Sequence, residues 1–148
     1  MKPTHIFLLA LALAMTACVT PVPTGAPQQS PVTQPRVGDS FSLRAGQSIT
    51  FSDAPVTVTF LTVKQDSRCP KSADCIRAGD VTASVQVTIN GGESRTVSLT
   101  WPGSTENPNT ESVGAYAVTL NDVQPYPETP DNPIRPEAYS ISLVVNRR

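Results

Sequence analysis

The sequence predicts an all-β domain, an antiparallel β-sandwich of about seven or eight strands, with a small β-barrel as the alternative. The chain of 148 residues contains 16 valines and 17 threonines but only three lysines, a composition that favours strands over helices. From Ser40 onward, apolar and polar residues alternate in nearly every segment, as expected of strands with one buried face. No segment has a helical period. Short strands at this spacing are typical of two sheets that cover each other.

The individual strands follow from this alternation. We expect strands over residues 41–43 and 49–51, joined by a hairpin turn at residues 45–47, and a third strand over residues 56–60. The cleanest alternation covers residues 81–89 and leads through Asn90-Gly91-Gly92 to a strand over residues 97–101. Because Asn-Gly adopts the positive φ that tight turns require, these two strands should pair antiparallel. Two further strands are expected over residues 116–120 and 139–145.

The N-terminus has the organisation of an export signal. Residues 1–17 contain Lys2, an apolar run of ten residues from Ile6 to Met15, and small residues before Cys18. The run is half of the roughly 20 residues that span a bilayer, so we expect a cleaved signal peptide. The junction at residues 14–18 resembles the bacterial lipobox, with Met15 where leucine is commonest. This resemblance implies that Cys18 carries acyl chains such as palmitate, which would hold the protein on a membrane. The alternative is an ordinary signal peptide with an incidental Cys18.

Residues 18–37 are expected to form a lipid-anchored spacer before a domain over residues 38–148. The segment contains five prolines among Gln, Thr, Ser and Gly and has no apolar periodicity. Proline favours extended polyproline II conformations, so the segment should act as a semi-rigid spacer.

Residues 66–80 are the most distinctive segment. Five residues separate Cys69 from Cys75, and an exported chain with two remaining cysteines is expected to join them in a disulfide. A redox-active pair is an alternative, although such pairs usually have the shorter C-x-x-C spacing. A calcium-like cation site formed by Asp66, Asp74 and Asp80 is a second alternative, because hard cations prefer oxygen ligands.

This segment also resembles a family of uncharacterised bacterial exported lipoproteins. The shared pattern is a strand ending in Asp-Ser-Arg-Cys-Pro, a second cysteine, and Ala-Gly before the next strand. The chain matches at Asp66, Ser67, Arg68, Cys69, Pro70, Cys75, Ala78 and Gly79 and departs at Arg77, where tryptophan is usual. The resemblance extends to residues 126–127 and 136–139 and implies no particular activity.

Two features beside the cysteines have alternative interpretations. Asp66 and Arg68 are expected to form an exposed ion pair that braces the disulfide segment, which would contribute about 0–1 kcal/mol; alternatively, Arg68 is an exposed recognition residue. Prolines recur at every third position from residue 127 to residue 136, which matches the polyproline II turn. This run is expected to be a stiff crossing loop before the last strand, or else a ligand for an aromatic groove.

The composition excludes several classes of function. His5, the only histidine, lies in the predicted leader, so the exported domain has none to serve as a general base or zinc ligand. A carboxylate pair among Glu128, Asp131 and Glu137 is the remaining enzymatic alternative. A net charge of −1 is not the excess of basic residues that nucleic-acid binding requires. We therefore expect a non-catalytic module without a cofactor, anchored in the cell envelope through Cys18, facing the extracytoplasmic side, and binding an envelope protein or a polysaccharide.

Overall fold

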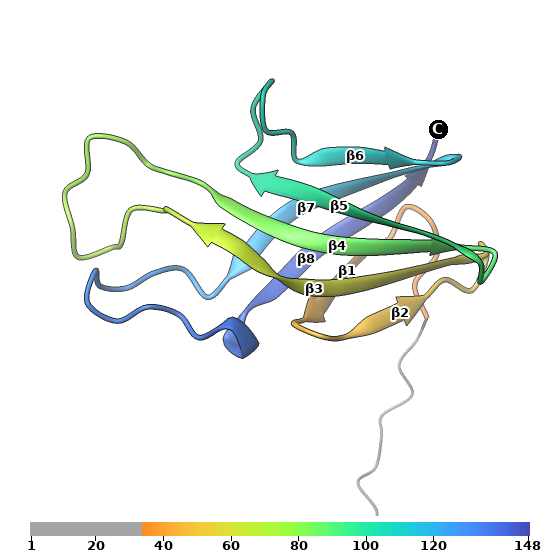
Figure 1. The fold of residues 1–148 in the computed structure, drawn as a ribbon, viewed down its shortest axis with the longest axis horizontal. Helices are drawn as coiled ribbons and strands as arrows, with labels where there is room; N and C mark the ends of the chain where they lie inside the picture. Colours follow the sequence, from red (N-terminus) through yellow and green to blue (C-terminus); the bar gives the residue numbers. More distant parts are fainter. Residues whose placement is uncertain (1–33) are drawn as a thin grey trace, which may run out of the picture. The chain divides into compact units, whose positions relative to one another are not determined.

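The computed structural model describes residues 34–148, which form two antiparallel four-stranded sheets (Figure 1). The strands are β1 (Ser40–Arg44), β2 (Ser48–Thr50), β3 (Val56–Asp66), β4 (Val81–Ile89), β5 (Glu93–Trp101), β6 (Thr110–Val113), β7 (Tyr116–Gln124) and β8 (Ser140–Arg147). One sheet has the order β1-β8-β7-β6 and the other has the order β2-β3-β4-β5. A short 3₁₀ helix, η1 (Pro136–Ala138), precedes β8. The predicted β-sandwich of about eight strands is confirmed.

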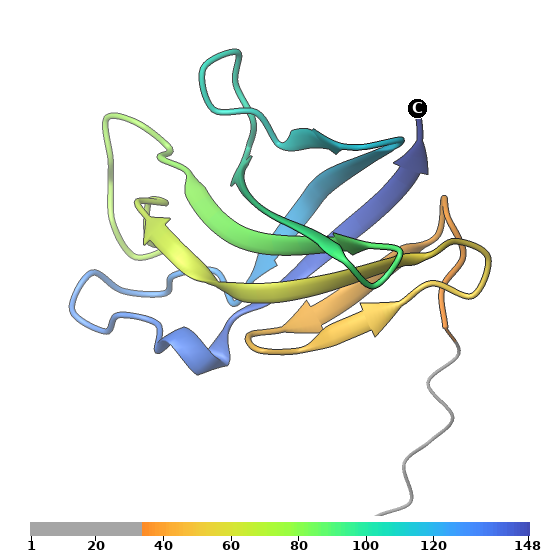
Figure 2. The same cartoon turned by 45° about the vertical axis from the view of Figure 1, so that its right-hand side comes forward.

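The two sheets face each other and are not closed into a barrel (Figures 1 and 2). Side chains from alternate positions of each strand fill the space between them, as the period-2 pattern predicts. The fully buried ones include Val58 and Phe60 of β3, Val85 of β4, Leu120 of β7 and Leu143 of β8. The small-barrel alternative is wrong, because no strand within residues 34–148 pairs across from one sheet to the other.

The outward faces of the strands account for the many threonines and serines. Hydroxyl pairs bridge neighbouring strands, with oxygen–oxygen distances of 2.9 Å between Thr50 and Thr57 and 2.8 Å between Thr88 and Ser94. Such cross-strand pairs stabilise a sheet through short side chains that need no burial.

The turn after β4 matches its prediction. Asn90 and Gly91 have φ values of 53° and 68°, and β4 and β5 pair antiparallel from Ile89 opposite Glu93 to Val81 opposite Trp101. Trp101 is partly buried against the core, as its phase in the strand predicts.

The predicted hairpin at residues 45–47 is wrong, because β1 and β2 lie in different sheets. The N–H of Ala45 donates to the carbonyl of Tyr139 in front of β8, whereas the N–H of Gly46 donates to the carbonyl of Phe60 in β3. The turn therefore carries the chain from one sheet to the other. Alternation alone cannot distinguish the two outcomes, because both require a tight turn between two amphipathic strands.

The boundary between spacer and domain lies earlier than predicted. Pro35 is buried, its carbonyl accepts a hydrogen bond from Ser52, and the N–H of Val37 donates to the Asp53 carboxylate over 3.0 Å. Residues 34–37 therefore belong to the folded unit. The predicted leader, the predicted lipidation site at Cys18 and the remainder of the predicted spacer lie outside the described residues. Within residues 34–148, no helix has the length and apolar character needed to cross a bilayer.

Candidate functional site

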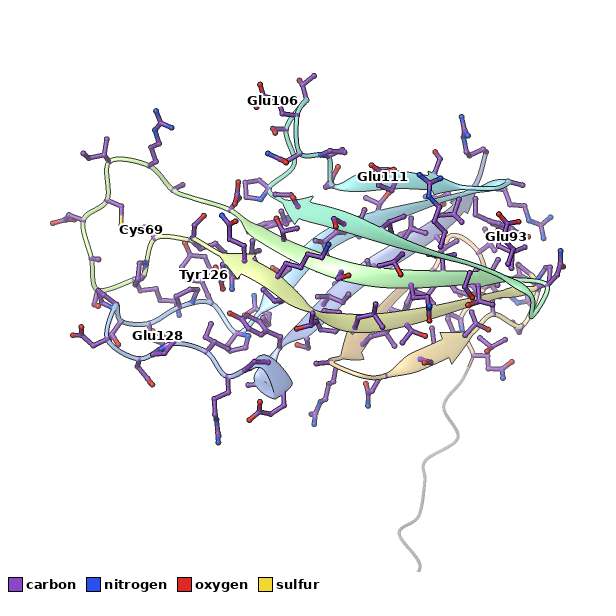
Figure 3. All side chains as sticks on the ribbon, viewed as in Figure 1. Cys69, Glu93, Glu106, Glu111, Tyr126 and Glu128 are labelled. Atoms are coloured by element: carbon purple, nitrogen blue, oxygen red, sulfur yellow. A yellow bond between two sulfur atoms is a disulfide. The ribbon has the colours of Figure 1, made fainter. Side chains whose placement is uncertain are left out.

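Two long loops meet at one end of the sandwich. We name residues 67–80, between β3 and β4, the disulfide loop, and residues 125–139, between β7 and β8, the proline loop. The two loops lie side by side in both ribbon views (Figures 1 and 2). Figure 3 shows Cys69, Tyr126 and Glu128 at this end, whereas Glu93 lies at the opposite end. Loops on a rigid scaffold are where binding residues concentrate.

The disulfide loop extends the β3–β4 ladder before it turns. The N–H of Ser67 donates to the carbonyl of Asp80, and the N–H of Cys69 donates to the carbonyl of Ala78, each over 2.8 Å. Cys69 and Cys75 form the predicted disulfide, which closes the tip of the loop into a ring. The base of the loop is therefore part of the sheet, and the ring is covalently fixed.

Arg68 and Asp66 form the predicted ion pair, but in a buried setting. The Arg68 Nη2 lies 2.6 Å from Asp66 Oδ2, and the side chains are only 1% and 10% exposed. The Arg68 Nε donates to Asp66 Oδ1 over 2.9 Å, which makes the pair bidentate. The alternative of an exposed Arg68 is therefore wrong, and so is the expectation of an exposed pair.

Arg68 also reaches from the disulfide loop to the other sheet. Its Nη1 donates to the carbonyl of Val123 over 2.6 Å, and its Nη2 donates to the carbonyl of Pro125 over 2.9 Å. The guanidinium lies over the ring of Tyr126, 4.9 Å from its centroid, in a cation–π contact. One buried side chain thus connects β3 with the end of β7 and the start of the proline loop.

Tyr139 completes this network from the far end of the proline loop. Its hydroxyl donates to Asp66 Oδ2 over 3.0 Å. Burial tends to raise the pKa of Asp66, but the hydrogen bonds and charge of Arg68, with the Tyr139 hydroxyl, hold this pKa below its ordinary value of 3.8. Burial first, and then the bond to the Asp66 carboxylate, raise the pKa of Tyr139 to about 12. Both pKa shifts favour the same protonation states, an ionised Asp66 beside a neutral Tyr139.

The two loops also contact each other directly. The N–H groups of Lys71 and Ser72 donate to the carbonyls of Pro127 and Glu128, each over 3.1 Å. An exposed ion pair joins Lys71 Nζ and Glu128 Oε1 at 2.7 Å. The disulfide ring therefore packs against the proline loop, and the two loops form one surface.

An open pocket of about 360 Å³ lies between the last residues of β3 and the proline loop. All four regularly spaced prolines (residues 127, 130, 133 and 136) line it. The proline run leads into the last strand, β8, as predicted, and connects it with its antiparallel neighbour β7 in the same sheet. The four prolines also form part of the wall of this pocket.

The three carboxylates of the predicted cation site are not brought together. Asp66 is engaged by Arg68 and Tyr139, Asp80 accepts a hydrogen bond from Ser67 through Oδ1, and Asp74 is exposed on the ring. Within residues 34–148, no three His, Cys, Asp or Glu side chains are grouped as metal ligands would be.

The carboxylates of the enzymatic alternative, Glu128, Asp131 and Glu137, are all exposed. Glu128 pairs with Lys71, Glu137 lies 3.7 Å from the Arg135 guanidinium, and both are well exposed. The pocket beside β3 is lined by one acidic side chain, Asp66. The lining of this pocket therefore contains no second carboxylate beside Asp66.

Fold and site together define a β-sandwich with two loops fixed against each other at one end. The chain matches no protein-family model, no curated protein and no solved structure. The resemblance to exported lipoproteins therefore stays a prediction. The structural roles of Tyr126 and Tyr139 were not predicted, although both lie in the segments to which that resemblance extends.

Proposed function

We propose that this protein is a lipid-anchored module of the cell envelope, non-catalytic, that binds another envelope component through the end formed by the disulfide and proline loops. The observation that carries the proposal is the buried Arg68 network, which fixes both loops to the scaffold and to each other. Loops ordered before binding lose little conformational entropy when a partner docks, which is a property of recognition surfaces.

An exposed apolar side chain supports this assignment. Ile76 is fully exposed on the disulfide ring, whereas the only other large exposed apolar side chain of residues 34–148 is Leu61, at 40%. A single exposed apolar residue is ordinary on a protein surface. Its location on a covalently closed ring, beside the pocket-forming loop, makes it a suitable anchor for a partner.

The anchoring part of the proposal rests on the sequence of the leader. We expect the full chain, expressed in bacteria with a labelled fatty acid, to incorporate the label, and the Cys18→Ala variant to lose it. Label retained by Cys18→Ala would contradict lipidation at this cysteine.

The binding part is tested by proximity labelling from the folded domain in intact cells. We expect reproducible labelled neighbours, and we expect Ile76→Asp to lose most of them. Leu61→Asp is the matched control, because it places the same charge at an exposed apolar position outside the two loops. Equal loss in both variants, or no reproducible neighbour for the unmodified chain, would contradict a binding end.

A redox role for Cys69 and Cys75 is the alternative function that the disulfide itself favours. Cys75 is exposed, so an external thiolate has access to the bridge. This alternative predicts that the oxidised protein exchanges rapidly with a small dithiol under native conditions. A bridge that is reduced only when the domain unfolds would support the structural role.

A further inference from the structure

We propose that the pocket between β3 and the proline loop binds a neutral aromatic side chain, of the tryptophan or tyrosine type, on a partner polypeptide. The inference rests on the proposed function and names the class of partner. Five observations lead to it: the size of the pocket, its proline walls, the neutrality of its charged pair, its polar groups and the irregular edge of β3.

The size and the walls of the pocket suit one planar side chain. A volume of about 360 Å³ is at the small end of the range for ligand pockets. Pro130, Pro133 and Pro136 contribute rings to one side, and Ile134 and Val63 contribute aliphatic surface. Proline rings have no rotatable side chain, so an aromatic face can pack on them without ordering the wall first.

The charged pair in the wall favours a neutral ligand. Asp66 and Arg68 both line the pocket, but they neutralise each other in a bidentate pair, and both carboxylate oxygens are already engaged. Lys64, the other charged residue in the lining, donates through its ammonium to the Ser98 hydroxyl of β5 over 2.8 Å. A charged ligand beside the Asp66–Arg68 pair would lose its hydration without gaining a counter-charge from that pair. The occupant that fits this wall is neutral.

Polar groups in the lining can form hydrogen bonds with the polar tip of such a side chain. Gln65, Thr129 and Asn132 line the pocket with amide and hydroxyl groups and are exposed. A buried indole N–H or phenol O–H usually has a hydrogen-bond partner, which an amide or hydroxyl oxygen supplies. A purely aliphatic side chain would leave these groups unused.

The edge of β3 favours anchoring of one residue over addition of a whole strand. β2 pairs only with residues 57–59 of β3, so the later part of this edge has no neighbouring strand. Two register shifts, between Phe60 and Thr62 and between Val63 and Gln65, interrupt the alternation of its main-chain groups. Such bulges prevent a regular ladder with an added strand. Isolated main-chain groups remain available for single hydrogen bonds beside an inserted side chain.

The test is an NMR titration of the ¹⁵N-labelled full chain with N-acetyl-tryptophanamide and N-acetyl-tyrosinamide. We expect saturable amide shifts confined to residues 63–66 and 127–139. N-acetyl-leucinamide, matched in backbone and neutral charge, should bind at least about tenfold more weakly, since it lacks the aromatic face and the polar tip. Absence of shifts, shifts elsewhere, or equal binding of the leucine probe would overturn the proposal.

Two proline variants test whether the probes bind in this pocket. Pro130→Ala and Pro133→Ala should each weaken binding by about fourfold for every ring methylene that leaves the contact. Pro55→Ala is the control, because Pro55 is equally exposed but lies in the loop between β2 and β3. Dispersed amide spectra would verify that each variant is folded. Equal affinities for all three variants would contradict the location.

Two outcomes separate this inference from the proposed function. If methyl β-glucoside shifts the same amides and the aromatic probes do not, the pocket takes a carbohydrate, and the polypeptide assignment is overturned. If no probe binds while proximity labelling still yields neighbours that depend on Ile76, the binding end is retained and only the pocket assignment fails.

Discussion

Arg68 is the residue on which the arrangement of the two loops depends. Its guanidinium satisfies the Asp66 carboxylate and two carbonyls that would otherwise be poorly solvated. A buried ion pair of this kind contributes little relative to an apolar replacement of the same shape, but removal of one partner is costly because the other charge is left buried. The energetic role of the pair thus follows from burial, which is set by the surrounding loops.

We predict that Arg68→Ala lowers the free energy of unfolding by about 3–5 kcal/mol. Arg68→Lys should restore only a small part, because an ammonium cannot form the bidentate contact and reach both carbonyls. Urea unfolding measures the effect. Arg135→Ala is the control, since the Arg135 side chain is 83% exposed and its pair with Glu137 should contribute about 0–1 kcal/mol. Similar losses in Arg68→Ala and Arg135→Ala would contradict a buried network.

Protonation of Asp66 should lower the free energy of unfolding at acid pH. Its folded-state pKa lies below the ordinary value of 3.8, so the folded state binds fewer protons than the unfolded state in this range. The resulting stabilisation is complete above the ordinary value and is lost as pH falls through the lower folded-state pKa. Unfolding free energies measured between pH 6 and pH 2 should fall for the native chain, and Asp66→Asn should remove this part of the decline. An unchanged slope in Asp66→Asn would show that other carboxylates cause it.

At the scale of elements, the disulfide loop depends on a close main-chain approach at its base. Gly79 has a φ of 70°, and a Cβ at this position would overlap the carbonyl oxygen of Ser67. Position 79, two residues before the start of β4, must therefore be glycine for two reasons, the positive φ and the lack of space for a Cβ. This explains why Ala-Gly precedes the strand in this chain.

Gly79→Ala should destabilise the domain more than Gly46→Ala. Both glycines have positive φ, but nothing lies within 4 Å of a Cβ built on Gly46. The backbone cost of about 1 kcal/mol is common to both. The overlap at Gly79 should add about 1–3 kcal/mol, the usual cost of overpacking. Thermal and urea unfolding would measure the difference, and equal losses would indicate that the loop base shifts freely.

The proline loop shows how an element acquires its role from its neighbours. Its regular prolines fit either an isolated polyproline II ligand or a stiff connection. Main-chain bonds from Lys71 and Ser72, together with the bond from Tyr139 to Asp66, fix it beside the disulfide loop. The rings therefore line a pocket of this chain.

At the scale of the whole molecule, the sandwich core and the loop end are separate sources of stability. The buried apolar side chains come from both sheets, and the disulfide lies outside this cluster. The core does not depend on the bridge for any of its contacts.

The Cys69→Ala/Cys75→Ala variant should consequently stay folded. We expect a loss of about 2–3 kcal/mol from the closed-ring entropy, with one cooperative transition retained. Hydrogen exchange should show faster exchange at the Lys71 and Ser72 amides and unchanged protection in β4 and β8. Native protein treated with reductant is the matched comparison. Collapse of protection throughout the sandwich would contradict independent sources of stability.

The sequence by itself determined the fold class, most strands, the β4–β5 hairpin and the disulfide pairing. Each depends on local signals, namely period-2 alternation, Asn-Gly turn chemistry and two cysteines close in the chain. The small strand β6 was not predicted because its four residues carry too little alternation.

Only the tertiary structure decided which sheet each strand joins, the burial of Asp66 and Arg68, and the pocket formed by the proline loop. These features depend on contacts between segments more than 50 residues apart, such as Arg68 with Val123 and Asp66 with Tyr139. Residue spacing along the chain contains no information about such distances. Burial then converts an ordinary Asp-x-Arg pair into the contact that fixes the two loops to the sandwich.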